Sequence, residues 1–275
     1  MTELSARLPL DLIHERGDAL AAQYDAETLL AAADDVRGFN VMLMEHPRVR
    51  RTLSNPGVPE DLKRQLVGDL FAEHMGAAGL GMCERLVSNR WRSPAELLDG
   101  AEIASAWMYL LVADKRGEIE QVEEELFRFW RILLASPDLV QVMEDERVPV
   151  QRRSDLLRSL LADKANSITL RLLNMSIARP GGVPFLLSVE RAIDLAAEVK
   201  TRRVAYVTAA APLTDQEMAS LAAELGRESG AEIDVKVSVD PSILGGVIIR
   251  LGDELIDGSV RRRLKDAQRE LGTST

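Results

Sequence analysis

The sequence is poor in cysteine and contains no long apolar run. Cys83 is the one cysteine among 275 residues, so no disulfide can form within the chain, and a reducing compartment is compatible with this composition. No stretch approaches the roughly 18 consecutive apolar residues of a membrane-spanning helix, and the longest candidate covers residues 106–113. Near the N-terminus, Glu3, Arg7 and Asp11 interrupt every apolar run that could serve as a signal peptide. We therefore expect membrane association only through partner proteins.

Positive charge and aromatic residues are also scarce. The chain has 34 Lys and Arg against 44 Asp and Glu, which gives a formal net charge of -10 and a pI near 5.0. Nucleic-acid binding needs a basic surface that contacts phosphates, so we expect no nucleic-acid partner. Aromatic residues make up 4% and hydrophobic residues 46%, which predicts one large core or two to three small ones built from Leu, Ala, Val and Ile.

No constellation of residues typical of catalysis, a metal or a cofactor is found. His14, His46 and His74 are scattered without cysteines or carboxylates at metal-ligand spacing, and we predict that they lie on the surface. Gly245-Gly246 precedes a strand pattern and is not followed by Lys-Ser or Lys-Thr, so it does not resemble a phosphate-binding loop. We expect no catalytic residues, no metal and no cofactor, and hence a protein that is not an enzyme.

An internal repeat is visible when the chain is compared with itself at a shift of 90 residues, without a gap. Apolar residues and prolines coincide while charged positions differ, which predicts two copies of one helical domain; the alternative is a chance match between two leucine-rich stretches. The same shift places Cys83 opposite Leu173, so we predict a packed thiol and not a nucleophile. The matching pairs are Phe39 and Phe129, Leu43 and Leu133, Pro47 and Pro137, Leu66 and Leu156, Leu70 and Leu160, and Leu80 and Leu170.

Each copy has the spacing of an antiparallel helical bundle. In the second copy, one helix face carries an apolar stripe, Ile119, Val122, Leu126, Phe129 and Leu133. Ser93-Pro94-Ala95-Glu96 has the pattern of a capping box with proline in the first turn. The helix that it starts can continue past Gly100 toward Leu111, in which case the two copies share a helix.

The C-terminal stretch has the pattern of β-strands. Ile233, Val235, Val237 and Val239 alternate with polar residues, and we predict a hairpin between this strand and residues 243–251, with its turn at Asp240-Pro241-Ser242. Gly245-Gly246 predicts a bulge or a close backbone approach in the second strand. Gly252-Asp253-Glu254 predicts another turn, followed by a short edge strand at Leu255-Ile256. Asp257-Gly258-Ser259 offers N-caps for a helix from Val260 to about Leu271.

These residues carry a resemblance to a known family. Asp240-Pro241-Ser242, Gly245-Gly246-Val247, Arg250-x-Gly252-Asp253 and Ile256-Asp257-Gly258-Ser259, taken in order, resemble the C-terminal motif of the ATP synthase delta subunit family, whose mitochondrial form is the oligomycin-sensitivity-conferring protein. Upstream, Pro212-Leu213-Thr214-x-x-Glu217 resembles the family's helix start and has the pattern of a capping box.

The resemblance implies a function and partners. It implies a non-catalytic subunit of the peripheral stalk, or stator, of the proton-translocating F-type ATP synthase. The helical domain would hold N-terminal helices of the alpha subunits, and the C-terminal domain would hold the C-terminus of the b subunit. It also implies peripheral association with the cytoplasmic face of the cell membrane. The alternative is a helical-repeat adaptor in an unrelated complex.

The predicted fold class is α+β, predominantly α. We expect two tandem helical bundles, residues 1–100 and 101–201, followed by a small α/β domain with a β-hairpin, residues 202–275. The family usually has one helical bundle, so the role of the first copy stays open between a second clamp for an alpha-subunit helix and a spacer.

Two regions are candidates for partner binding. One is a groove between the first and fifth helices of the second copy, for which bundle core is the alternative; its residues are Trp107, Leu110, Leu111, Leu170, Leu173 and Ile177. The other is Arg261-Arg262-Arg263, placed in a first helical turn where the helix dipole disfavours positive charge. These arginines could bind acidic residues of a partner, or they could form a solvated basic edge.

Overall fold

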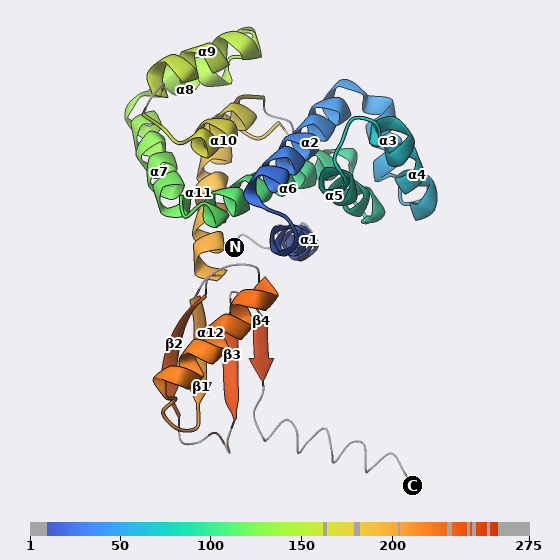
Figure 1. Ribbon diagram of the computed structural model, residues 1–275. Coiled ribbons are helices and arrows are strands. Elements are labelled where there is room, and N and C mark those ends of the chain that lie inside the picture. The colour runs from blue at the N-terminus through green and yellow to red at the C-terminus, as the bar shows by residue number, and fades with distance from the viewer. Residues whose placement is uncertain are drawn as a thin grey trace, which may run out of the picture. The chain divides into compact units, whose positions relative to one another are not determined.

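The computed structural model describes residues 10–161, 164–178, 182–202, 204–229, 233–240, 243, 246–251 and 254–257. The chain divides into two compact units at the boundary between Ala197 and Glu198. The first unit is helical, and the second contains a four-stranded sheet (Figure 1). This agrees with the predicted α+β class, in which helices predominate.

The first unit repeats one arrangement of helices. Helices α3, α4 and α5 begin at residues 47, 60 and 77, and α8, α9 and α10 begin at residues 137, 150 and 167 with the same lengths of 8, 12 and 12 residues. Each start is displaced by 90 residues, which supports the predicted repeat. The helices are α1 (Leu10–Gln23), α2 (Ala26–Glu45), α3 (Pro47–Ser54), α4 (Glu60–Phe71), α5 (Ala77–Ser88), α6 (Pro94–Lys115), α7 (Ile119–Ala135), α8 (Pro137–Glu144), α9 (Val150–Leu161), α10 (Ser167–Ala178) and α11 (Phe185–Arg202), whose last turn belongs to the second unit.

Equivalent carboxylates cap equivalent helices in the two halves of this unit. An oxygen of Asp35 accepts a hydrogen bond from the N–H of Gly76 at 2.9 Å, just before α5. An oxygen of Glu125 accepts one from the N–H of Asn166 at 2.7 Å, just before α10. Helix starts leave N–H groups without partners inside the helix, so each carboxylate satisfies one of them and ties two helices together.

Helix α6 is shared by both halves, a point that the sequence left open. It runs without interruption through residue 100, and its residues from 100 to 113 are all buried. It contacts α1, α2, α3 and α5 of the first half and α7 and α10 of the second (Figure 1). A helix with neighbours on all sides must be apolar around its circumference, which explains why it lacks an amphipathic pattern. The predicted domains 1–100 and 101–201 meet inside this helix.

The start of α6 departs slightly from the predicted capping box. The hydroxyl of Ser93 accepts a hydrogen bond from the N–H of Glu96 at 3.2 Å, as the pattern predicts. The carboxylate of Glu96, however, accepts from the N–H of Arg92 at 2.7 Å. In a capping box the backbone N–H of the N-cap residue donates this second hydrogen bond. Here the donor is the residue before the N-cap, Arg92.

The second unit contains β1 (Val204–Ala209), α12 (Asp215–Ser229), β2 (Asp234–Val239), β3 (Val247–Leu251) and β4 (Glu254–Asp257). The sheet order is β2-β1-β3-β4, with β1 parallel to β2 and antiparallel to β3. The predicted hairpin between residues 233–239 and 243–251 is therefore wrong, because β1 lies between these strands. Alternation reveals which face of a strand is buried and not which strand pairs with it. The hairpin in this sheet is β3–β4, with β4 as the predicted edge strand.

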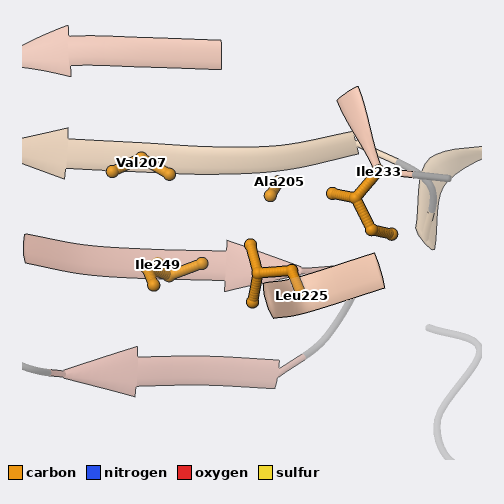
Figure 2. Close-up of a cluster of buried hydrophobic side chains, with 5 residues drawn as sticks. All are labelled: Ala205, Val207, Leu225, Ile233 and Ile249. Carbon is orange, nitrogen blue, oxygen red and sulfur yellow. The ribbon is translucent and has the colours of Figure 1, made fainter. Parts of the chain in front are cut away.

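One face of the sheet packs against α12. Ala205 and Val207 of β1, Ile249 of β3, Leu225 of α12 and Ile233 form its buried cluster (Figure 2). The predicted capping box starts α12: Thr214 Oγ1 accepts from the N–H of Glu217 at 3.3 Å, and the Glu217 carboxylate accepts from the N–H of Thr214 at 2.8 Å. The helix is the crossover that a parallel β1–β2 pair requires.

Candidate partner-binding site

The residues of the predicted groove lie in the interior of the first unit. Trp107, Leu110, Leu173 and Ile177 are 0% exposed and Leu111 is 8% exposed. Leu170 is half-buried. Side chains that the chain itself covers do not line an open groove, so their positions fit the alternative of bundle core. Where a partner helix binds stays a prediction.

Helix α1 covers Trp107. The indole stacks on the ring of His14 with centroids 3.9 Å apart, and its N–H donates to a carboxylate oxygen of Asp18 at 3.2 Å. Gly17 makes this approach possible, because a Cβ at that position would lie 2.6 Å from Cδ1 of Trp107. His14 is 3% exposed, so its predicted surface position is wrong. His14 is buried because α1 packs on α6, and no local sequence pattern predicts that packing.

Helix α2 of the first half packs on the first helix of the second half, α6, and an ion pair links it to the fifth, α10. The hydroxyl of Ser105 on α6 donates to the carbonyl of Ala33 at 3.1 Å. The hydroxyl of Tyr109 on α6 donates to Asp34 at 2.6 Å, and the guanidinium of Arg171 on α10 forms an ion pair with the same carboxylate. Burial, followed by the bond to Asp34, raises the pKa of Tyr109 to about 12, so the phenol stays a donor at neutral pH. The chain thus places one of its own helices over the predicted groove.

A pocket lies on the first half, between α1, α4 and α5. Its volume is about 360 Å³, and Arg16, Arg64 and Arg85 line it together with Glu15, Glu60 and Glu84. Arg64 forms ion pairs with Glu60 at 3.5 Å and Asp61 at 2.6 Å. No sequence motif marks this pocket, because its residues come from three separate helices.

The predicted turn and motif residues are only partly within the described residues. The N–H of Asp240 donates to the carbonyl of Ala209 at 2.9 Å, which extends the β1–β2 pairing. Gly246 has φ of 84°, a conformation that favours glycine, and Asp257 pairs with Ile248 in the β3–β4 ladder. Pro241, Gly245, Gly252, Asp253, Gly258, Ser259 and the three arginines Arg261, Arg262 and Arg263 lie outside the described residues.

Ionisable groups inside the first unit have structural roles. Cys83 is 0% exposed, as predicted for a packed thiol, and burial raises its pKa, which disfavours a nucleophilic thiolate. Glu102 of α6 is 3% exposed and accepts a hydrogen bond from Ser188 of α11 at 2.9 Å. Burial raises the pKa of Glu102 to about 7, while Ser188 and Arg191 act in the opposite direction.

The described part of the chain offers neither a metal site nor a membrane-spanning helix. Its residues contain no group of three or more His, Cys, Asp or Glu side chains that could hold a metal ion. Within the same part, no helix combines the length and apolar character that a membrane crossing needs.

Comparison with known proteins identifies the family. The family model described as ATP synthase delta (OSCP) subunit matches residues 106–271. The ATP synthase subunit delta of Salinispora arenicola is 36% identical over 271 residues, covering 98% of this chain and 99% of the relative. That of Frankia alni is 39% identical over 244 residues, covering 87% of this chain and 86% of the relative. A chain of the solved Toxoplasma gondii mitochondrial ATP synthase hexamer is 23% identical and covers 60% of this chain and 96% of its own length, with a TM-score of 0.29, which is too low for an argument about fold. This chain belongs to the ATP synthase delta (OSCP) subunit family.

Proposed function

We propose that this protein is a non-catalytic peripheral-stalk subunit of the proton-translocating F-type ATP synthase. It links the catalytic head to the b subunits and resists the torque of the rotor. The observation that carries the proposal is the match to relatives named ATP synthase subunit delta over 98% of the chain, first half included. A static link needs slow dissociation from its partners, which buried helix-to-helix contacts provide.

The helical unit binds N-terminal helices of the alpha subunits. The unit is made of helices, and its own α2 packs on α6, with the carboxylate of Asp34 bonded to Tyr109 of α6 and Arg171 of α10. An amphipathic helix from a partner can use the same kind of contact, with apolar residues at i, i+3, i+4 and i+7 against the bundle.

The second unit binds the C-terminus of the b subunit. The face of its sheet opposite α12 carries Tyr206, which is 43% exposed, and the guanidinium of Arg250 lies 4.9 Å from the centroid of that ring. An exposed aromatic ring next to an arginine is typical of contact surfaces between proteins. Arg261, Arg262 and Arg263 add cations for acidic residues of the same partner. The protein reaches the cytoplasmic face of the membrane through these partners.

Reconstitution tests this function. Membranes stripped of the peripheral ATPase are supplied with the catalytic head with and without the purified chain, and ATP-driven proton pumping is measured. We expect pumping only when the chain is present, because the head otherwise turns with the rotor. Equal pumping in both samples would contradict the proposal, as would copurification with a soluble complex that lacks ATPase subunits.

A further inference from the structure

Four polar side chains link α6 to α11. On α6, Asp99 and Glu102 are three residues apart, a spacing that places them on one face of the helix. On α11, Ser188 and Arg191 have the same spacing. The hydroxyl of Ser188 donates to a carboxyl oxygen of Glu102 at 2.9 Å. The guanidinium of Arg191 forms an ion pair with Asp99, so one face of α11 is held on α6 by two polar links.

The two links contain two acidic groups but one cation. The ion pair of Asp99 with Arg191 is balanced in charge as long as Glu102 is protonated. Glu102 is 3% exposed, and its second oxygen has no hydrogen-bond partner among the described residues. Ionisation adds a buried negative charge that has neither a cation of its own nor water around it, which is costly. Burial raises the pKa of Glu102 to about 7, against the effect of Ser188. The charged groups that act on it are Arg191 of α11, which lowers its pKa, and Asp99 of α6 itself, which raises it.

The first half has apolar residues at the equivalent place. Subtracting the repeat distance of 90 residues from positions 102, 188 and 191 leads to Leu12, Leu98 and Ala101. Leu98 and Ala101 are buried, and Leu12 is half-buried. Apolar side chains therefore fill this place in the first half, so the packing does not require a carboxyl group. A buried ionisable group where apolar residues suffice is suited to a switch.

Helix α11 connects the two compact units. Residues up to Ala197 belong to the first unit and residues from Glu198 to the second, so the links to α6 act on the part of α11 that the first unit holds. We propose that these links form a pH-sensitive latch, which is closed while Glu102 is protonated and which releases the start of α11 from α6 when Glu102 ionises. A closed latch shortens the free segment between the units, so the connection stiffens as the pH falls. The latch is a property of the chain itself and does not depend on the proposed function.

Amide hydrogen exchange of the full-length chain tests the latch, with each rate corrected for the intrinsic exchange rate at its pH. Opening exposes Glu102 to water and returns its pKa toward 4.5, so the opening constant should rise on the order of 70-fold from pH 5 to pH 8. We expect the protection of the amides of residues 189–195 to fall by that factor. Local opening is insensitive to low concentrations of urea, whereas global unfolding is sensitive. The α11 amides should therefore exchange independently of urea at pH 8, while those of α2 should not.

Two variants identify the group that titrates. Glu102→Gln keeps an acceptor for Ser188 and cannot ionise, so the protection of α11 should change by less than about threefold between pH 5 and pH 8. The matched control Glu190→Gln, at an exposed position of α11, should keep the fall seen in the parent. Circular dichroism at pH 5 checks that both variants fold. The inference is wrong if Glu102→Gln retains the fall, or if the α11 and α2 amides of the parent exchange only through the same urea-dependent route. The urea experiment on the parent needs neither variant.

Discussion

Arg153 and Glu102 are both buried, and they differ in their hydrogen-bond partners. The guanidinium of Arg153 donates to the carbonyls of Met143 at 2.8 Å, Val148 at 3.1 Å and Ile177 at 3.2 Å. Two of these carbonyls lie in the last turns of α8 and α10, where helices leave acceptors without partners. Glu102 has Ser188 for one oxygen, and its other oxygen has no hydrogen-bond partner among the described residues.

We expect Arg153→Leu to lower the free energy of unfolding by on the order of 3 kcal/mol, because it leaves three buried carbonyls without their donor. Urea unfolding followed by circular dichroism measures the change. The control is Arg152→Leu, at an exposed position of the same helix, for which we expect a change within about 0.5 kcal/mol. Equal losses in the two variants would mean that the guanidinium contacts contribute nothing.

Because burial raises the pKa of Glu102, we expect the stability of the protein to depend on pH. The pKa is about 7 in the folded protein against 4.5 in the unfolded chain, so the folded state keeps a proton that the unfolded chain loses between these values. Stability therefore falls as the pH rises from about 4.5 to 7, by on the order of 2 to 3 kcal/mol. Glu102→Gln cannot ionise and keeps an acceptor for Ser188, so it should be more stable than the parent at pH 8.

Urea unfolding at pH 5 and pH 8 checks this prediction. The stability difference between Glu102→Gln and the parent should be small at pH 5 and should grow toward pH 8. Glu120→Gln, at an exposed position of α7, serves as the control and should show no such growth. If the two variants respond alike to pH, the buried carboxyl is not the source of the dependence.

At the scale of helices, the packing of α6 depends on a glycine. A Cβ at Gly100 would lie 2.2 Å from Cη2 of Trp91. The indole cannot easily move away, because it is 3% exposed and its N–H donates to the carbonyl of Leu86 at 2.7 Å. Gly100 therefore permits the contact between α6 and the loop before it.

We expect Gly100→Ala to lower the unfolding free energy by about 2 kcal/mol, although alanine favours a helix over glycine. Thermal unfolding of the full chain measures it. Gly38→Ala is the matched control: it is also inside a helix, but nothing lies within 4 Å of its added Cβ, so we expect a gain of about 0.5 to 1 kcal/mol. Stabilisation by both variants would show that Trp91 can adjust.

At the scale of the whole molecule, α6 joins the two halves of the first unit. A fragment that ends at residue 100 removes Ser105 and Tyr109 and uncovers the face of α2 that they contact. We expect residues 1–202 to unfold in one cooperative urea transition and residues 1–100 to unfold gradually with a small m-value. A cooperative transition with a proportionate m-value for residues 1–100 would instead support the first bundle as an independent domain.

The sequence by itself determined the starts of several helices and the family, and it indicated the repeat. These features depend on residues close together in the chain. Proline and capping residues start helices at Ser93 and Thr214, and apolar spacing indicates the faces that are buried. The C-terminal motif is also a run of turn residues close together in the chain. Such signals can be read without knowing which elements surround a segment, and the predicted edge strand at Leu255-Ile256 is confirmed as β4.

Only the tertiary structure decided which elements meet. Alternation in residues 233–239 showed a buried face, but the parallel partner β1 replaced the expected hairpin partner. Periodicity also could not reveal that His14 is covered by α6 or that α2 packs on α6. A side chain is buried by residues that are distant in the sequence. The apolar spacing of a segment indicates that its burial is favourable but not which residues cover it, because the hydrophobic effect is not directional.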